Sequence, residues 1–359
     1  MNQRQLALAH FNRAAKYYQK AIYVQAIHHY LAGLKIDATR AEIYADLAKA
    51  YEMLGCWDHA LNSLETALRL RPGFTTALRR KQRILEEQAF YEAAQNRLDV
   101  NPELPVQHRR SENSTDNTIE IEHSRFTLTC PDTTPQSTIS AVCQLAERIY
   151  NEVGGMFQCY PRHPIPISME DASLPSYSTL NRTLPPWAAA RYNNGIQLIH
   201  RPGNTGTGIL STLIRHEWVH LTVDLLAQGQ CPRWLDEGLA QTIARPLMNF
   251  EHEYLEDARQ NQQLLTMDVL KKPFHQFDSR QRRLAYLQSS AIVGYLVNQF
   301  GFARIREILN RIGNGSASEI AIQDTLGKTP DEILASWQLD NNGANHETQS
   351  NPRTENPFV

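Results

Sequence analysis

The stretch IRHEWVHLTVDLLAQGQCPRWLDEGLAQ, residues 214–241, decides how the second half of the chain folds. Apolar residues surround two histidines four positions apart, which predicts a helix that passes through a core. Gly229 and then Pro232 are signals that end this helix, and a second helix is predicted to start near Trp234. The stretch therefore predicts two successive helices joined by a short turn.

The first of these helices carries the pattern His-Glu-x-x-His. Its histidines, His216 and His220, are spaced so that one face of a helix presents both imidazoles, one turn apart. Two nitrogen ligands at that separation can bind one zinc ion at about 2.0–2.1 Å each. Glu217 then lies beside the metal, where its carboxylate can take a proton from water. The alternative is that both histidines are core residues without a metal.

A catalytic zinc site needs a third protein ligand and an open position for water. Glu237 is the candidate, because the sixteen residues between it and His220 allow an antiparallel return to the level of the histidines. Asp236 is the competitor, and it points about 100° away around the helix, so only one of the two carboxylates can face the metal. The sequence predicts His216, His220 and Glu237 as the metal ligands.

The first hundred residues repeat with a period of 34. Residues 7–40 align with 41–74, and the second copy has small residues at 48, 60 and 67 and large ones at 44, 47, 51 and 64. Pro72 ends its second helix. The pattern resembles the tetratricopeptide repeat, with a degraded continuation from Thr75 to about Arg97. We expect an α-helical repeat domain over residues 1–100, with a concave surface for a substrate or partner protein.

Composition limits the classes of protein that the chain can belong to. Its 359 residues suffice for about two domains, and the formal net charge of −2 gives no global attraction to nucleic acid. Runs of arginine and lysine near residues 79–83 and 280–283 are interpreted as solvated helix faces. The five scattered cysteines favour reduced thiols in a cytoplasmic protein, and neither a signal peptide nor a membrane span is expected.

Residues after the repeats predict a linker, an α+β domain and a tail. Residues 101–117 are rich in Pro, Ser and Asn, which is typical of a linker. Alternating residues predict strands near 118–122, 126–130, 165–169 and 195–200, and a helical stripe runs from Ile139 to Val153. Helices follow, so residues 118–340 are expected to form an α+β domain. Residues 341–359 are expected to be a disordered tail.

Taken with Trp-Leu-x-Glu-Gly-Leu-Ala, residues 234–240, the His-Glu-x-x-His motif is similar to that of the gluzincin peptidases. The closest resemblance is to the peptidase MA-like metallohydrolase family, whose members often carry tetratricopeptide repeats on the same chain. The likeness extends from about residue 118 to 337 and includes residues 185–192 and 285–290. It implies a gluzincin-like α+β zinc metallopeptidase domain in which His216, His220 and Glu237 bind Zn²⁺ and Glu217 is the general base.

The resemblance also suggests residues around the metal. Tyr286 matches by position a tyrosine of related zinc aminopeptidases, which implies that it stabilises the oxyanion, at the start of a helix over residues 284–300. Several gluzincins have an aspartate that orients a histidine ligand; here Gln241 occupies that position, and Asp224 is the alternative acceptor. Tyr192 and His200 could border a substrate cleft, although packing is the simpler role for both.

The function that follows is that of a zinc metallopeptidase, with the repeats recruiting a substrate or partner. The strand at residues 195–200 could bind the substrate backbone by edge pairing. One alternative is a repeat-based interaction scaffold whose second domain binds zinc but is catalytically idle. Another keeps the chemistry and replaces the peptide with a non-peptide amide. Glu217 favours an enzyme, because an idle site has no use for a carboxylate beside its ligands.

Overall fold

The computed structural model describes residues 3–20, 22–53, 56–97, 118–171, 190–192, 195–200 and 207–344. The chain forms two compact units. One contains residues 1–150 and 162–217, and the other contains residues 151–161 and 218–359. The division falls within one continuous helix, α8, so this helix contributes residues to both units.

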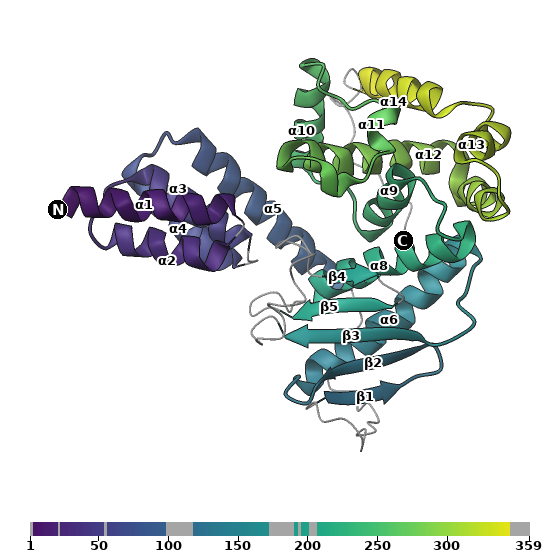
Figure 1. The fold of residues 1–359 in the computed structure, drawn as a ribbon, viewed down its shortest axis with the longest axis horizontal. Helices are drawn as coiled ribbons and strands as arrows, with labels where there is room; N and C mark the ends of the chain where they lie inside the picture. The colour runs from purple at the N-terminus through teal and green to yellow at the C-terminus, as the bar shows by residue number, and fades with distance from the viewer. Residues whose placement is uncertain are drawn as a thin grey trace. The chain divides into compact units, whose positions relative to one another are not determined.

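The N-terminal part of the chain is helical (Figure 1). Its helices are α1 Gln3–Gln19, α2 Tyr23–Leu34, α3 Ala41–Glu52, α4 Trp57–Leu70 and α5 Thr75–Arg97. Helices α1 and α2 pack together as one hairpin, and α3 and α4 pack as the next. Each hairpin buries apolar side chains that neither of its helices could bury alone, which is how repeated helical pairs gain stability.

Small side chains lie where the 34-residue pattern places them. Ala48, Ala60 and Ala67 are fully buried, and the larger Leu64 is buried between them. Helix α4 ends at Leu70, just before the Pro72 that was predicted to stop it. The helical hairpins are thus present, and their assignment to the tetratricopeptide repeat stays a prediction.

A five-stranded mixed sheet forms the centre of the next part of the chain. Its strands are β1 Thr118–Glu122, β2 Phe126–Pro131, β3 Ile165–Asp171, β4 Ala190–Tyr192 and β5 Ile196–His200, in the order β1-β2-β3-β5-β4. The inner pairs β2–β3 and β3–β5 are parallel, and the outer strands β1 and β4 are antiparallel. Helix α6, Gln136–Phe157, connects β2 to β3 and buries its apolar stripe from Ile139 to Val153, as predicted. Helices and a mixed sheet make the fold α+β.

Edge pairing of substrate by β5 was a wrong expectation. Ile196 to Leu198 pair with β3 on one side and with β4 on the other, so β5 is an inner strand there. The error arises because β4 has only three residues, Ala190–Tyr192, too few for alternation to reveal a strand. The outer strand on this side of the sheet is β4.

The C-terminal part of the chain is a set of helices. They are α8 Thr207–Ala227, α9 Arg233–Ala244, α10 Asn249–Gln260, α11 Met267–Leu270, the 3₁₀ turn η1 Phe274–Gln276, α12 Ser279–Gly313, α13 Ser318–Leu326 and α14 Pro330–Ala344. Within the described residues, none of the helices contains a stretch apolar and long enough to cross a bilayer.

Helix α12 starts earlier than the predicted range of 284–300. Asp278 caps its N-terminus, because its side chain accepts hydrogen bonds from the backbone N–H groups of Arg280 and Gln281 at 2.9 and 2.8 Å. The backbone leaves the helical conformation at Gly301, where φ is 72°, and then continues helically to Gly313. Tyr286 therefore lies two turns inside the helix rather than at its start.

Close packing of α9 on α12 depends on Gly238. A Cβ atom at this position would lie 2.5 Å from Cγ2 of Val293 and 2.6 Å from the backbone oxygen of Ser289. At the far end of α12, a Cβ on Gly313 would collide with the backbone oxygen of Leu226 in α8. Glycine at two positions thus lets one long helix touch the backbones of both helices that follow the sheet.

Replacing Gly238 by alanine should therefore destabilise the protein by about 1–3 kcal/mol, because the added methyl group meets backbone that cannot turn aside. Gly294→Ala is the matched control: Gly294 lies on the facing helix α12, and a Cβ there would meet nothing closer than 4.0 Å. The control should be neutral or slightly stabilising, since alanine favours a helix more than glycine does. Chemical denaturation of both variants measures the difference. Equal stability of Gly238→Ala and the wild type would disprove the close approach.

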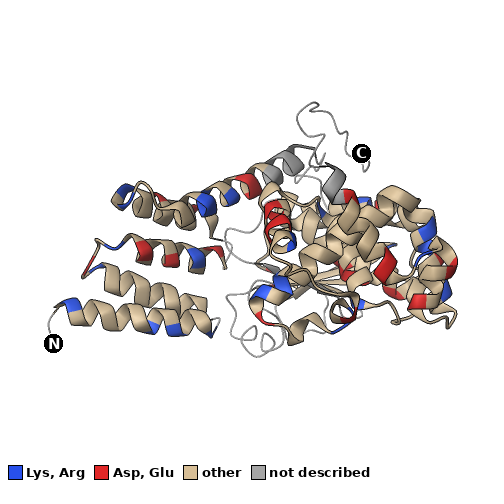
Figure 2. Cartoon of the chain, turned by 90° about the horizontal axis from the view of Figure 1, so that it is seen from above, with Lys and Arg blue, Asp and Glu red and all other residues tan. Residues whose placement is uncertain are grey.

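Positive charge near residues 79–83 is partnered within the chain. Arg80 and Arg83 both contact Glu52, and Lys81 lies 2.9 Å from Glu65. Figure 2 shows acidic and basic residues interspersed along the helices in the same manner. The prediction of a solvated face is wrong for Arg80 and Arg83, whose side chains are only 21% and 22% exposed because they pack on Glu52.

Some predicted segments lie outside the described residues. These are the linker, residues 101–117, and most of the tail, residues 345–359. The first four residues of the predicted tail belong to α14, which continues to Ala344. All five cysteines are among the described residues, and none forms a disulfide.

Candidate metal site

Helix α8 carries the first two candidate ligands through apolar surroundings. Ile214, Trp218 and Val219 are almost completely buried, so the helix is packed on several sides. His216 and His220 are half-buried, and Glu217, between them in sequence, is only 6% exposed. Three titratable side chains thus lie within about one turn of a helix in apolar surroundings, an arrangement found at chemical sites.

The turn between α8 and α9 reverses the chain. Gln228 and Gly229 have φ angles of 49° and 72°, the left-handed conformation that ends many helices. Pro232 is extended and precedes the first residue of α9. This helix buries Trp234 and Leu235 together with Glu237, whose side chain is 3% exposed. The reversal that the sequence predicted is confirmed.

His216, His220 and Glu237 come together. Each offers one ligand atom, and these three atoms all lie within 4.8 Å of one another. The gap between Nε2 of His220 and Oε2 of Glu237 is 3.6 Å. Two imidazole nitrogens and one carboxylate oxygen are a donor set that binds divalent metals such as zinc. The group could therefore hold a metal ion.

Asp236 holds the imidazole of His220 from its other side. The Nδ1 atom of His220 lies 2.7 Å from Oδ1 of Asp236, a hydrogen bond in which the ring N–H donates to the carboxylate. This bond fixes the tautomer and leaves Nε2 for a metal. The acceptor for His220 is thus Asp236, and orientation of a histidine by Gln241 or Asp224 stays a prediction. Asp236 and Glu237 are neighbours in α9 and point about 100° apart, so their carboxylates reach opposite sides of the His220 ring.

Glu237 has two further neighbours, Arg233 and Tyr286. The guanidinium of Arg233, one turn earlier on α9, contacts Oε1 of Glu237. The hydroxyl of Tyr286 is hydrogen-bonded to the same carboxylate and to Arg233. Burial raises the pKa of Glu237 above its ordinary value, although the charges of His220 and Arg233 act in the opposite direction. A bound cation would favour the ionised carboxylate further.

The family model of the Peptidase MA superfamily matches residues 192–340. Residues 192–340 are therefore similar to the Peptidase MA superfamily, and His216, His220, Glu237 and Tyr286 all fall within the matched residues. No curated protein matches the chain, and no solved structure does either.

Tyr286 reaches the site from α12. Its ring packs edge-on against Phe274 with centroids 5.2 Å apart, which fixes the direction of the side chain. Burial raises the pKa of the phenol to about 12. The hydroxyl therefore keeps its proton at neutral pH and can donate a hydrogen bond. Of the other predicted neighbours, the side chains of Tyr192 and His200 lie outside the described part of the structure.

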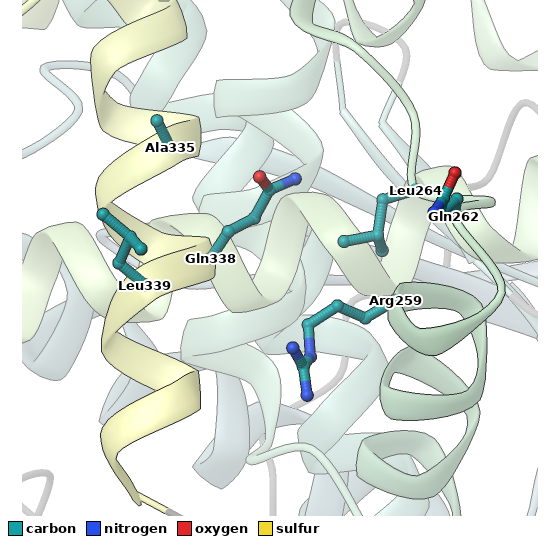
Figure 3. A pocket seen from close by; sticks show the side chains of 6 residues that line it. All are labelled: Arg259, Gln262, Leu264, Ala335, Gln338 and Leu339. Atoms are coloured by element: carbon teal, nitrogen blue, oxygen red, sulfur yellow. The ribbon is translucent and has the colours of Figure 1, made fainter.

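A pocket lined by residues of α14 and of the segment at the end of α10 contains none of these groups (Figure 3). Gln338 points from α14 toward Leu264 and Arg259 on the opposite wall, and Gln262, Ala335 and Leu339 complete the lining. Arg259 is paired with Glu256. The lining offers neither an imidazole nor a carboxylate, so it cannot supply the chemistry of the metal group.

Proposed function

We propose that the chain is a zinc-dependent peptidase of the gluzincin type. The observation that supports it best is the convergence of His216, His220 and Glu237 within 4.8 Å, with Glu217 next to the first ligand on α8. Two histidines and a glutamate are the ligand set of zinc peptidases that keep one position open for water. When bound, zinc acts as a Lewis acid that lowers the pKa of water toward about 7 and polarises a carbonyl.

Glu217 moves the proton in this mechanism. Its carboxylate takes a proton from the attacking water and then delivers it to the nitrogen of the leaving amine. Burial of Glu217 keeps bulk water from competing for that proton. Asp236 keeps His220 in the orientation that ligation needs.

Tyr286 stabilises the negative charge that develops on the carbonyl oxygen of the substrate. Its hydroxyl remains protonated at neutral pH and lies next to the ligand Glu237, so it is positioned to donate a hydrogen bond beside the metal.

The remaining parts of the chain have proposed roles of their own. Residues 1–100 present tetratricopeptide repeats to a protein substrate or partner, residues 101–117 link them to the hydrolase domain over 118–340, and the protein is cytoplasmic. The helical hairpins and the match to a peptidase superfamily support this arrangement.

Metal analysis and a peptide-library assay of the full chain test the proposal. The purified protein should contain about one zinc per chain and should hydrolyse members of the library. Zinc without hydrolysis, together with tight binding of a protein partner to residues 1–100, would favour the scaffold instead. Hydrolysis confined to non-peptide amides would retain the chemistry and change the substrate class.

Tyr286→Phe should lower kcat by about 10²–10³ and leave KM and zinc content nearly unchanged, because the lost hydrogen bond forms mainly in the transition state. Tyr295→Phe, on the same helix α12, is the matched control and should retain full activity. A fall in zinc affinity with normal kcat at saturating zinc would assign the hydroxyl to holding Glu237 instead. Normal kcat together with normal zinc affinity would show that Tyr286 serves neither catalysis nor metal binding.

A further inference from the structure

Arg233 contacts two carboxylates of α9: Glu237, a member of the candidate metal group, and Asp236, which holds His220. Its Nη2 atom contacts Oε1 of Glu237, and its Nη1 atom lies 3.4 Å from Oδ2 of Asp236. The other oxygen of each carboxylate faces His220: Oδ1 of Asp236 is 2.7 Å from Nδ1, and Oε2 of Glu237 is 3.6 Å from Nε2. The guanidinium of Arg233 thus contacts one oxygen of both carboxylates, and the imidazole of His220 faces the remaining oxygen of both.

The position of Arg233 in α9 explains this arrangement. It is the first residue of the helix, so Asp236 and Glu237 follow it at the i+3 and i+4 positions and lie one turn above it. Pro232, extended, leads the chain into the helix. A planar guanidinium offers N–H groups in a fixed fork, which can serve two neighbouring carboxylates at once.

We propose that Arg233 is a positioning residue for the metal: it engages Oε1 of Glu237 so that Oε2 alone is left as ligand, and it steadies Asp236 against His220. The inference rests on the proposed zinc site. Single-oxygen ligation by Glu237 matters, because binding through both oxygens would fill the coordination position that a hydrolase keeps for water. Arg233 would therefore help to keep the site open as well as to hold the metal.

Direct binding of a substrate carboxylate is the competing role for Arg233. The side chain is 44% exposed, which would permit it. Both Nη atoms, however, are directed at carboxylates of α9, and Glu237 is only 3% exposed, so little solvent screens its attraction to the guanidinium. The contacts favour the positioning role.

Zinc affinity and the spectrum of the cobalt-substituted full-length protein test the inference. Arg233→Gln and Arg233→Lys should weaken zinc binding by about 10–100-fold in competition with a chelator, the usual effect of losing a partner that orients a ligand. The lysine variant should lose less, because it keeps the charge but not the fork. With Co²⁺, Arg233→Gln should show weaker visible absorption, since ligation by both oxygens of Glu237 raises the coordination number.

Arg245→Lys is the matched control, because Arg245 follows the last residue of α9 and pairs with Glu251 at 2.7 Å. This variant should leave zinc affinity and cobalt absorption unchanged.

The possible results separate the two proposals. If zinc affinity and cobalt absorption are unchanged in both variants, the role proposed for Arg233 is wrong and the proposed function is unaffected. A rise in KM for carboxylate-bearing peptides at normal zinc affinity has the same meaning. Absence of zinc binding in the wild type would overturn the proposed function itself. If Arg233→Gln does not fold, as judged by circular dichroism, Arg233→Lys decides the matter by the same measurements.

Discussion

Glu217→Gln should reduce kcat by about 10²–10⁴ while zinc stays bound at about one ion per chain. Glutamine has nearly the shape of glutamate, so the buried position in α8 can accept it without a cavity. Its amide cannot accept a proton from water at neutral pH, which removes the step assigned to the carboxylate. Steady-state kinetics on a peptide found in the library assay, with metal analysis of the same sample, measures both quantities.

Glu253→Gln provides the control for this prediction. Glu253 lies exposed on α10, and the same change of charge there should leave kcat and zinc content unaltered. A Glu217→Gln variant that turns over at the wild-type rate would show that another group is the base. A variant that loses its zinc would show instead that Glu217 serves the metal or the fold.

His216→Ala should reduce zinc content from about one ion per chain to nearly none and abolish hydrolysis, because two remaining ligands cannot hold the metal against dilution. Metal analysis after gel filtration, with circular dichroism to check the fold, measures the outcome.

His252→Ala is the matched substitution outside the group, at an exposed position of α10. It should keep its zinc. Full zinc occupancy in folded His216→Ala would mean that the ion binds elsewhere, and the site would have to be reassigned. Parallel loss of zinc in His220→Ala and Glu237→Ala would confirm that the three side chains bind one ion.

Much of the site could be predicted from one stretch of sequence because its determinants are local. Helical spacing alone put His216 and His220 on one face of α8, and Gly229 with Pro232 marked the reversal that returns Glu237 to them. The structure brings these three residues together as predicted. Strands and helices with strong alternation or a long apolar stripe were found for the same reason.

Contacts that depend on the direction of a side chain could not be predicted in this way. Asp236 was treated as a competitor for the metal, whereas it holds His220. Arg233 carried a signal, its i,i+4 spacing from Glu237, but such pairs are common on helix surfaces and rarely indicate a site. The start of α12 was placed too late because Asp278, a capping residue, lies before the apolar pattern begins.

The five residues 228–232, which join α8 to α9, have a consequence for the order of folding. The chain entropy lost in closing a loop grows with the length of the loop. Because this connection is short, bringing His220 and Glu237 together loses little chain entropy. Contacts that are local in sequence also form faster than those between distant strands. All three candidate metal ligands belong to this one helical hairpin, and the parallel sheet requires pairing across longer stretches of chain. The hairpin is therefore expected to form early, and zinc to accelerate folding as well as to delay unfolding.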